Sequence, residues 1–161
     1  MVRLKIPVIA FLGYLYQGDY SIPIKLADEL KAKGLDVLDL SLGAMKAADI
    51  LRILSPNKLI ILTADKKGKK ELRIYKPDDI ENKISTWIDV ISSMSAYYMD
   101  INSFLKVAKS LDVLPEDTTI IECEVELDEG IELSEWGKEC LELMKKKIIE
   151  YFRGYSTFSQ G

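Results

Sequence analysis

Continuous apolar runs alternate with amphipathic segments along most of the chain. Residues 6–12 and 58–64 hold a single charge, at Lys58, as in strands that are buried on both faces of a parallel sheet. Largely apolar stretches at 35–40 and 118–125, each with two acidic residues, predict two further strands. Residues 71–75 alternate between apolar and polar side chains, which predicts an antiparallel strand, hairpinned against the strand at 58–64, with one face open to water.

Apolar side chains recur at helical spacing between these runs. Serine is a common helix N-cap and glycine a common stop, so helix boundaries are visible. The spacing predicts a helix between Ser21 and Gly34, one over 44–54, two within 78–111, and a long one from Ser134 to about Phe152. This order of elements predicts an α/β fold: a three-layer α/β/α sandwich, phosphorylase/hydrolase-like, with a five-stranded, mostly parallel sheet and one antiparallel strand. We expect one domain over residues 1–153, and a flexible tail over 154–161.

Ligands in parallel α/β folds bind beyond the carboxyl ends of the strands. The first such loop, residues 13–20, contains Gly13, Tyr14, Gly18, Asp19 and Tyr20. Right-handed crossovers place the loops after the first and third strands at the same end of the sheet. We therefore expect Asp19 and Tyr20 to approach Thr63 and Asp65, and this end of the sheet is the candidate site.

Composition excludes several classes of function. The net charge of −4 argues against a general nucleic-acid binder, because such proteins present a basic surface. The chain has no histidine, which excludes the usual Ser-His-Asp and Cys-His relays and every His-ligated metal site. Cys123 and Cys140 are too few for a metal site or a disulfide framework, so we expect two reduced, packed thiols.

The N-terminal residues loosely imitate a signal peptide, with Arg3 and Lys5 before an apolar run. No small-x-small cleavage site follows, and the run is far shorter than the ~20 residues that span a bilayer. We interpret it as a buried strand, and we expect a cytoplasmic protein with no membrane insertion.

Three segments together resemble the hydrogenase maturation endopeptidase family, over about residues 6–150. They are LGYLYQGDY at 12–20, KLIILTADKKGKKELRIYKPDDI at 58–80, and TTIIECEVELDEGIELSEW at 118–136. The resemblance implies a nickel-dependent protease that removes the C-terminal extension of the [NiFe]-hydrogenase large subunit. It also implies three metal ligands: an acid in the first loop, an Asp after the third strand, and a His before the penultimate helix.

The family's first motif is only partly present in this chain. Gly13, Gly18 and Asp19 match it, whereas Tyr14 stands where the family has Asn. The three ligand positions of the family fall on Tyr20, on Thr63, and at about Tyr97. Phenol and hydroxyl oxygens are poor ligands for divalent metals at neutral pH, because tyrosine ionises only near pH ~10. We therefore expect no nickel and no other cofactor.

Our leading hypothesis is a divergent member without nickel-dependent peptidase activity, which acts as a binding or assembly factor for a hydrogenase large subunit or a related metalloenzyme. The alternative is an active endopeptidase that uses Asp19, Asp65 and Asp100 around a hard cation such as Mg²⁺ or Mn²⁺. These three residues lie one, two and three positions from the replaced ligands. The simpler explanation, which we prefer, is that these aspartates are partners of backbone N–H groups.

Two further interpretations stay open. A doubly wound domain could bind a small anion at the first helix N-terminus, but Gly13 and Gly18 are separated by bulky residues, and Pro23 removes one backbone donor. The tyrosines of the candidate site either form a contact surface or fill the space that a metal site takes in the family. They are Tyr14, Tyr16, Tyr20, Tyr97 and Tyr98.

Overall fold

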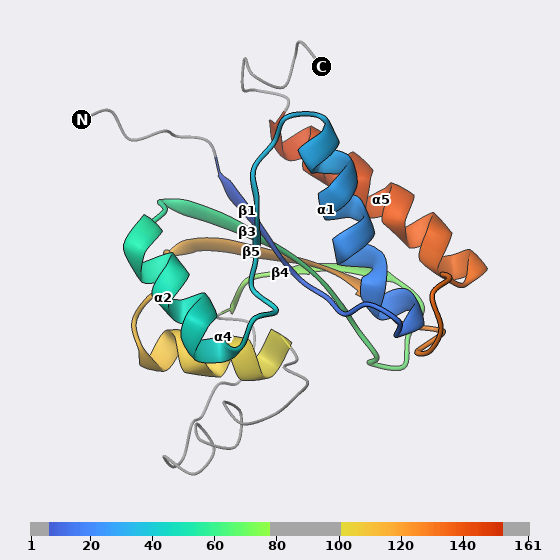
Figure 1. The fold of residues 1–161 in the computed structure, drawn as a ribbon, viewed down its shortest axis with the longest axis horizontal. Coiled ribbons are helices and arrows are strands. Elements are labelled where there is room, and N and C mark those ends of the chain that lie inside the picture. The colour runs from blue at the N-terminus through green and yellow to red at the C-terminus, as the bar shows by residue number, and fades with distance from the viewer. Residues whose placement is uncertain (1–6, 78–100, 153–161) are drawn as a thin grey trace.

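The computed structural model describes residues 7–77 and 101–152, and its centre is a five-stranded sheet. The strands are β1 (Val8–Leu12), β2 (Val37–Asp39), β3 (Lys58–Asp65), β4 (Leu72–Tyr75) and β5 (Asp117–Glu124). Their order across the sheet is β2-β1-β3-β5-β4, with β4 alone antiparallel to its neighbour (Figure 1). The predicted mixed α/β sheet is confirmed.

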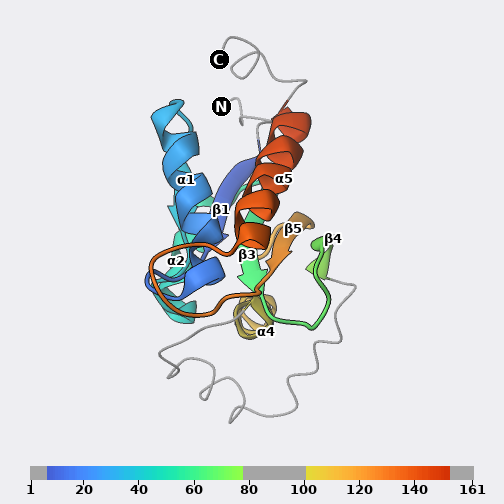
Figure 2. The same ribbon diagram turned by 90° about the vertical axis from the view of Figure 1, so that its right-hand side faces the viewer.

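Helices cover both faces of this sheet and complete the three layers (Figures 1 and 2). On one face lie α1 (Ile22–Ala32) and α5 (Glu135–Phe152), and on the other α2 (Ala44–Leu54) and α4 (Ile101–Ser110). A short 3-10 helix, η1 (Gly18–Ser21), joins β1 to α1. The other helix predicted within 78–111 lies outside the described residues. No described helix has both the length and the apolar character needed to cross a membrane.

The uncharged stretch of β3 between Lys58 and Asp65 follows from the central place of this strand in the sheet. Ile60 and Leu62 point into the core under α1 and α5, whereas Leu59 and Ile61 point into the core under α2 and α4. All four side chains are buried, because successive residues of a strand face opposite sides and both sides are covered here.

The predicted hairpin between β3 and β4 is wrong. β4 pairs with β5, with Leu72 opposite Cys123 and Tyr75 opposite Ile120, and β5 lies between β3 and β4. The connection over residues 66–71 crosses two strand spacings, or about 10 Å, which six residues at ~3.3 Å each span with ease. A turn signal next to an alternating strand therefore located β4, but did not identify its partner.

The expectation of two reduced thiols is also wrong. Cys123 of β5 and Cys140 of α5 form a disulfide, with their Cα atoms 6.1 Å apart. Both side chains are fully buried in the core between the sheet and α5. The expectation rested on compartment and cysteine count alone, whereas the register of β5 and the inner face of α5 bring the two sulfur atoms together. The bridge ties the last helix to the sheet.

Candidate functional site at the carboxyl end of the sheet

Asp19 is a fully buried carboxylate at the end of the first loop. Its Oδ2 accepts hydrogen bonds from the backbone N–H groups of Glu126 (2.9 Å) and Leu127 (3.0 Å) and from the hydroxyl of Ser134 (2.7 Å). Its Oδ1 accepts a bond from the backbone N–H of Ser134 (2.9 Å). These four donors belong to the segment between β5 and α5, more than 100 residues away along the chain. Asp19 therefore joins the first loop to the last one.

The two loops approach each other so closely that glycine is required at two positions. Gly18 has φ +56°, and a Cβ there would overlap the carbonyl oxygen of Leu127. A Cβ on Gly137, in the first turn of α5, would overlap Oδ1 of Asp19. The hydroxyl of Ser134 accepts a hydrogen bond from the N–H of Gly137 (2.9 Å), so Ser134 caps α5 as predicted. The Asp19 carboxylate thus lies at the N-terminus of α5, where the helix dipole stabilises a negative charge.

The rest of the first loop is closed by backbone hydrogen bonds. The N–H of Tyr14 donates to the carbonyl of Tyr20 (3.0 Å), and the N–H of Tyr20 donates to the carbonyl of Gln17 (3.1 Å). The N–H of Gly13 donates to the hydroxyl of Ser41 (2.9 Å), which connects the loop to the segment after β2. Tyr20 is partly buried against the core under α1 and α5. These hydrogen bonds hold the first loop in a defined conformation.

A buried ion-pair cluster occupies the α2/α4 face at the same end of the sheet. Thr63 of β3 lies beside Glu122 of β5, which in turn lies beside Arg73 of β4. Glu122 is fully buried and pairs with Arg73 Nε (2.7 Å) and with Lys67 Nζ (2.7 Å). Its Oε2 accepts a hydrogen bond from the Tyr75 hydroxyl (2.8 Å). Two cations therefore neutralise the carboxylate that lies next to Thr63.

Glu124 extends this cluster by two residues along β5. It pairs with Arg73 Nη1 (2.7 Å) and accepts hydrogen bonds from the N–H groups of Lys67 (3.0 Å) and Gly68 (3.0 Å). Burial raises the pKa of Glu124, but the bonds from Arg73 and from these two backbone groups lower the pKa by more. Burial, followed by the neighbouring Glu122, raises the pKa of Tyr75 far above its ordinary value. Glu124 is therefore ionised and Tyr75 neutral in the folded protein near neutral pH.

Sequence reasoning missed the role of Glu122 and Glu124. The available signal was the alternation of Arg73 and Tyr75 with apolar residues along β4, which places a cation and a phenol on one face. That signal identifies the cluster only when β4 is known to pair with β5.

The predicted site residues divide into two groups in the structure. Thr63 and Asp65 lie at the carboxyl end of β3, next to the cluster on β5. Oδ1 of Asp65 accepts a hydrogen bond from the N–H of Lys66 (2.8 Å), and its carbonyl accepts one from Arg73 Nη2 (3.1 Å). The Asp19 carboxylate instead turns toward the start of α5. Tyr97 and Asp100 lie outside the described residues.

The described residues also bear on metal binding. Within 7–77 and 101–152, no three His, Cys, Asp or Glu side chains are grouped so that they could hold a metal ion. At the two ligand positions that these ranges include, the donors on offer are the Tyr20 phenol and the Thr63 hydroxyl. Neither suits nickel, which imidazole nitrogen and other stronger donors bind well.

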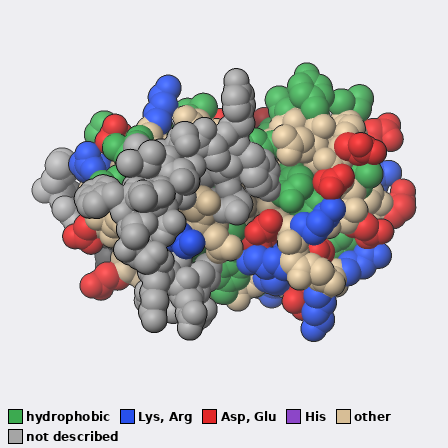
Figure 3. Space-filling view, turned by 90° about the horizontal axis from the view of Figure 1, so that it is seen from below, with side chains coloured by type: hydrophobic (Ala, Val, Ile, Leu, Met, Phe, Trp, Pro, Cys, Tyr) green, Lys and Arg blue, Asp and Glu red, His purple; other side chains and the backbone are tan. Residues whose placement is uncertain are grey.

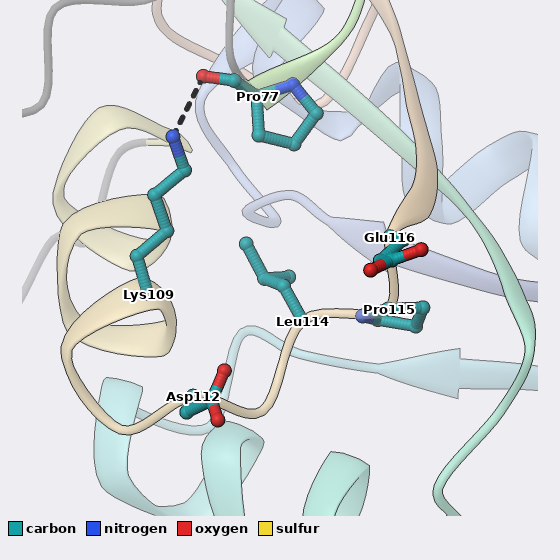
Figure 4. Close-up of a pocket in the computed structure, with 6 residues that line it drawn as sticks. All are labelled: Pro77, Lys109, Asp112, Leu114, Pro115 and Glu116. Carbon is teal, nitrogen blue, oxygen red and sulfur yellow. Dashed lines mark hydrogen bonds between the residues drawn. The ribbon is translucent and has the colours of Figure 1, made fainter.

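A cavity of about 470 Å³ lies away from this site, at the amino end of β5 (Figure 4). It is lined by Pro77, Lys109, Asp112, Leu114, Pro115 and Glu116. Lys109 extends along one side of it and donates a hydrogen bond to the carbonyl of Pro77 (3.1 Å). Among the predicted site residues that lie within 7–77 and 101–152, none lines this cavity, so we do not include it in the candidate site.

The arrangement of strands, loops and helices can be compared with known proteins. The family model described as hydrogenase maturation protease (HycI) matches residues 23–151, which is most of the chain. The chain belongs to the hydrogenase maturation protease family. No curated protein sequence matches it significantly. The resemblance deduced from the three sequence segments is thus confirmed at the level of the family.

Solved structures of this family share the fold. The solution structure of the endopeptidase HycI from Escherichia coli is similar, with a TM-score of 0.67 and 20% identity, over 93% of this chain and 92% of that one. A [NiFe] hydrogenase maturation protease HycI from Thermococcus kodakarensis KOD1 gives a TM-score of 0.64 at 19% identity, over 93% and 94%. A hydrogenase 2 maturation peptidase from Thaumarchaeota archaeon SCGC_AB-539-E09 gives 0.56 at 22% identity, over 91% and 97%.

Proposed function

We propose that this family member has no nickel-dependent peptidase activity and acts as a binding or assembly factor for a hydrogenase or a related metalloenzyme. The observation that supports this most is the environment of Thr63. It stands where the resemblance places a metal-binding Asp, and the carboxylate beside it, Glu122, is buried and neutralised by Lys67 and Arg73. A metal ion there would have to displace two cations that are already paired.

The donor chemistry supports the same conclusion. Tyr20 offers a phenol and Thr63 a hydroxyl, and neither kind of oxygen is a good ligand for a divalent metal. The sequence contains no histidine at any position, so an imidazole ligand is excluded along the whole chain. The residues present therefore do not fit nickel, and we derive no catalytic step through it.

The alternative of an active endopeptidase with a carboxylate site is less well supported. It needs Asp19 to direct an oxygen toward Asp65 and Asp100. Both oxygens of Asp19 accept hydrogen bonds from the segment between β5 and α5, so a cation would have to replace those donors. Breaking the hydrogen bonds of a buried charge costs several kcal/mol, in the range of about 3–5.

A partner follows from family membership rather than from the ligand positions. Hydrogenase maturation proteases act on the large-subunit precursor, and this chain shares their fold. We infer that a member of this family without the metal chemistry can still recognise that subunit. The proposed partner is therefore a hydrogenase large subunit or the subunit of a related complex.

Coprecipitation with a hydrogenase large-subunit precursor tests this proposal. The precursor would be prepared with and without its C-terminal extension and mixed with the tagged chain, and its mass followed for a day. We expect a stable complex with at least one form and no change in the mass of the extension. Absence of a complex with both forms, or removal of the extension by the pure chain, would contradict the proposal.

A further inference from the structure

Three large apolar side chains are exposed on two neighbouring loops at the carboxyl end of the sheet. Leu15 is 59% exposed, Tyr16 71%, and Ile131 66%. A bridge between Gln17 and Gly130, with a hydrogen bond from Gly18 N–H to the Gly130 carbonyl (2.9 Å), holds their two loops together. Figures 1 and 2 show these loops side by side next to the start of α5. We call Leu15, Tyr16 and Ile131 the apolar patch.

The backbone at Tyr16 is strained, although its side chain lies on the surface. Its φ is +64°, a conformation that bulky L-residues rarely adopt and that costs them roughly 1–2 kcal/mol. The ring gains no burial in return, because most of it faces solvent. Backbone strain that yields no packing benefit is concentrated at binding and catalytic sites. Tyr16 is thus an independent sign that the patch contacts something outside the chain.

Acidic residues flank the apolar patch, and two of them have no ion-pair partner in the part of the chain that the structure describes. These are Glu129 and Glu132, on either side of Ile131 along the sequence and both exposed. Other acids of the same loop are already paired: Asp128 with Lys66 (2.8 Å) and Glu126 with Lys70 (3.1 Å). Figure 3 shows hydrophobic side chains at the right-hand end of the molecule, with both acidic and basic side chains beside them.

We propose that the apolar patch binds a protein segment in which large apolar side chains stand next to lysine or arginine, with Glu129 and Glu132 pairing with those cations. The proposal rests on the proposed function, because the segment would belong to the bound partner. Charge complementarity selects this occupant. Anionic lipid and nucleic acid would both be repelled by the two glutamates, and a second copy of this chain would bring its own unpaired Glu129 and Glu132 against them.

Synthetic peptides test this surface without any hydrogenase. Three fluorescein-labelled 12-residue peptides would be titrated by fluorescence anisotropy: one of Leu, Phe and Lys, one with Glu in place of Lys, and one with Ser in place of Leu and Phe. We expect the first to bind the wild-type chain at least about tenfold more tightly than the other two. In ¹⁵N NMR spectra, the peptide should shift the amides of residues 15–18 and 129–132.

Substitutions distinguish binding at the apolar patch from non-specific hydrophobic binding. Ile131→Ser should weaken binding of the Leu-Phe-Lys peptide about tenfold, whereas Ile53→Ser, at an exposed isoleucine of α2, should leave it unchanged. The double change Glu129→Gln and Glu132→Gln should weaken binding and reduce its salt dependence, unlike Glu116→Gln at the opposite end of the sheet. Tyr16→Asn should weaken binding while keeping or raising stability, because asparagine tolerates a positive φ.

Three results of the peptide titrations would contradict binding at the apolar patch: no binding by the wild-type chain, equal affinity for the three peptides, or equal affinity of wild type and Ile131→Ser for the Leu-Phe-Lys peptide. Full binding of the hydrogenase precursor by Ile131→Ser would overturn it too, while leaving the proposed function intact. If the precursor does not bind but the peptide series behaves as expected, the proposed partner is wrong, whereas the apolar patch is still a peptide-binding site.

Discussion

Replacing Asp19 by asparagine tests whether this residue is a structural anchor or a potential metal ligand. The change keeps the shape of the side chain but removes the charge and turns one acceptor into a donor. An asparagine oxygen in the place of Oδ2 can keep the bonds from Glu126, Leu127 and the Ser134 hydroxyl. Its NH₂ group then faces the N–H of Ser134, so two donors oppose each other at the start of α5.

The size of the effect follows from these contacts. A hydrogen bond to a charged group contributes about 1.5–3 kcal/mol and a neutral one about 0.5–1.5, so three bonds each weaken by roughly 1 kcal/mol. Loss of the fourth bond, with a buried N–H left unpaired, costs about another 1–3 kcal/mol. Allowing for relaxation, we expect Asp19→Asn to lower the free energy of unfolding by about 4 kcal/mol, and Tm by roughly 10 °C.

Urea unfolding followed by circular dichroism at pH 7, with a chelator present, measures this change. Asp36→Asn is the matched control, because Asp36 is exposed, and we expect it to alter stability by less than about 0.5 kcal/mol. Unchanged or increased stability of Asp19→Asn without metal would refute the reasoning. That outcome would mean that the Asp19 oxygens are not committed to backbone donors, and it would favour the carboxylate-site alternative.

Three further predictions concern the disulfide and the buried cluster. The Cys123–Cys140 bridge closes a loop with a sequence separation of 17, so its reduction should lower the free energy of unfolding by about 3 kcal/mol. The intact mass of the protein under non-reducing conditions should show no free thiol. Burial raises the pKa of Tyr75, so an absorbance titration should show Tyr75 still protonated at about pH 11. Because tyrosine in the unfolded chain ionises near pH ~10, the free energy of unfolding should fall above that pH, and it should fall less in Tyr75→Phe. The pKa of Glu124 is lower in the folded protein than in the unfolded chain, so its ionised form adds stability above its ordinary pKa, and this stability is lost as pH falls through the pKa of the folded protein. The free energy of unfolding of Glu124→Gln should therefore depend less on pH in the acid range. Free thiols, full titration of all tyrosines by pH 11, or an unaltered acid limb would each contradict the corresponding prediction.

Local patterns predicted the elements well, because each depends on neighbouring residues. Helix α2 has the predicted bounds 44–54, and α5 begins directly after Ser134, since a serine cap and helical spacing are written in adjacent positions. The run at 58–64, uncharged after Lys58, predicted the central strand for a similar reason: a strand covered on both faces is mostly apolar. The family resemblance followed from the same segments in the same order.

Features that depend on distant residues could not be predicted in this way. The pairing of β4 with β5, the bridge between Cys123 and Cys140, and the four hydrogen bonds to Asp19 all join segments that approach each other only after folding. Asp19 was chosen from the sequence as a candidate site residue of the first loop. In the structure its carboxylate holds the start of α5 in place. The sequence alone could not distinguish this structural role from that of a metal ligand.

Nickel titration combined with incubation against a hydrogenase large-subunit precursor tests the central claim most directly. The chain would be titrated with Ni²⁺ by calorimetry, and the nickel-treated chain then mixed with the nickel-loaded precursor, whose mass is followed over time. We expect no stoichiometric nickel binding and an intact C-terminal extension. One nickel bound per chain together with removal of the extension would show that the family's chemistry persists here on a different set of ligands, and would contradict the proposal.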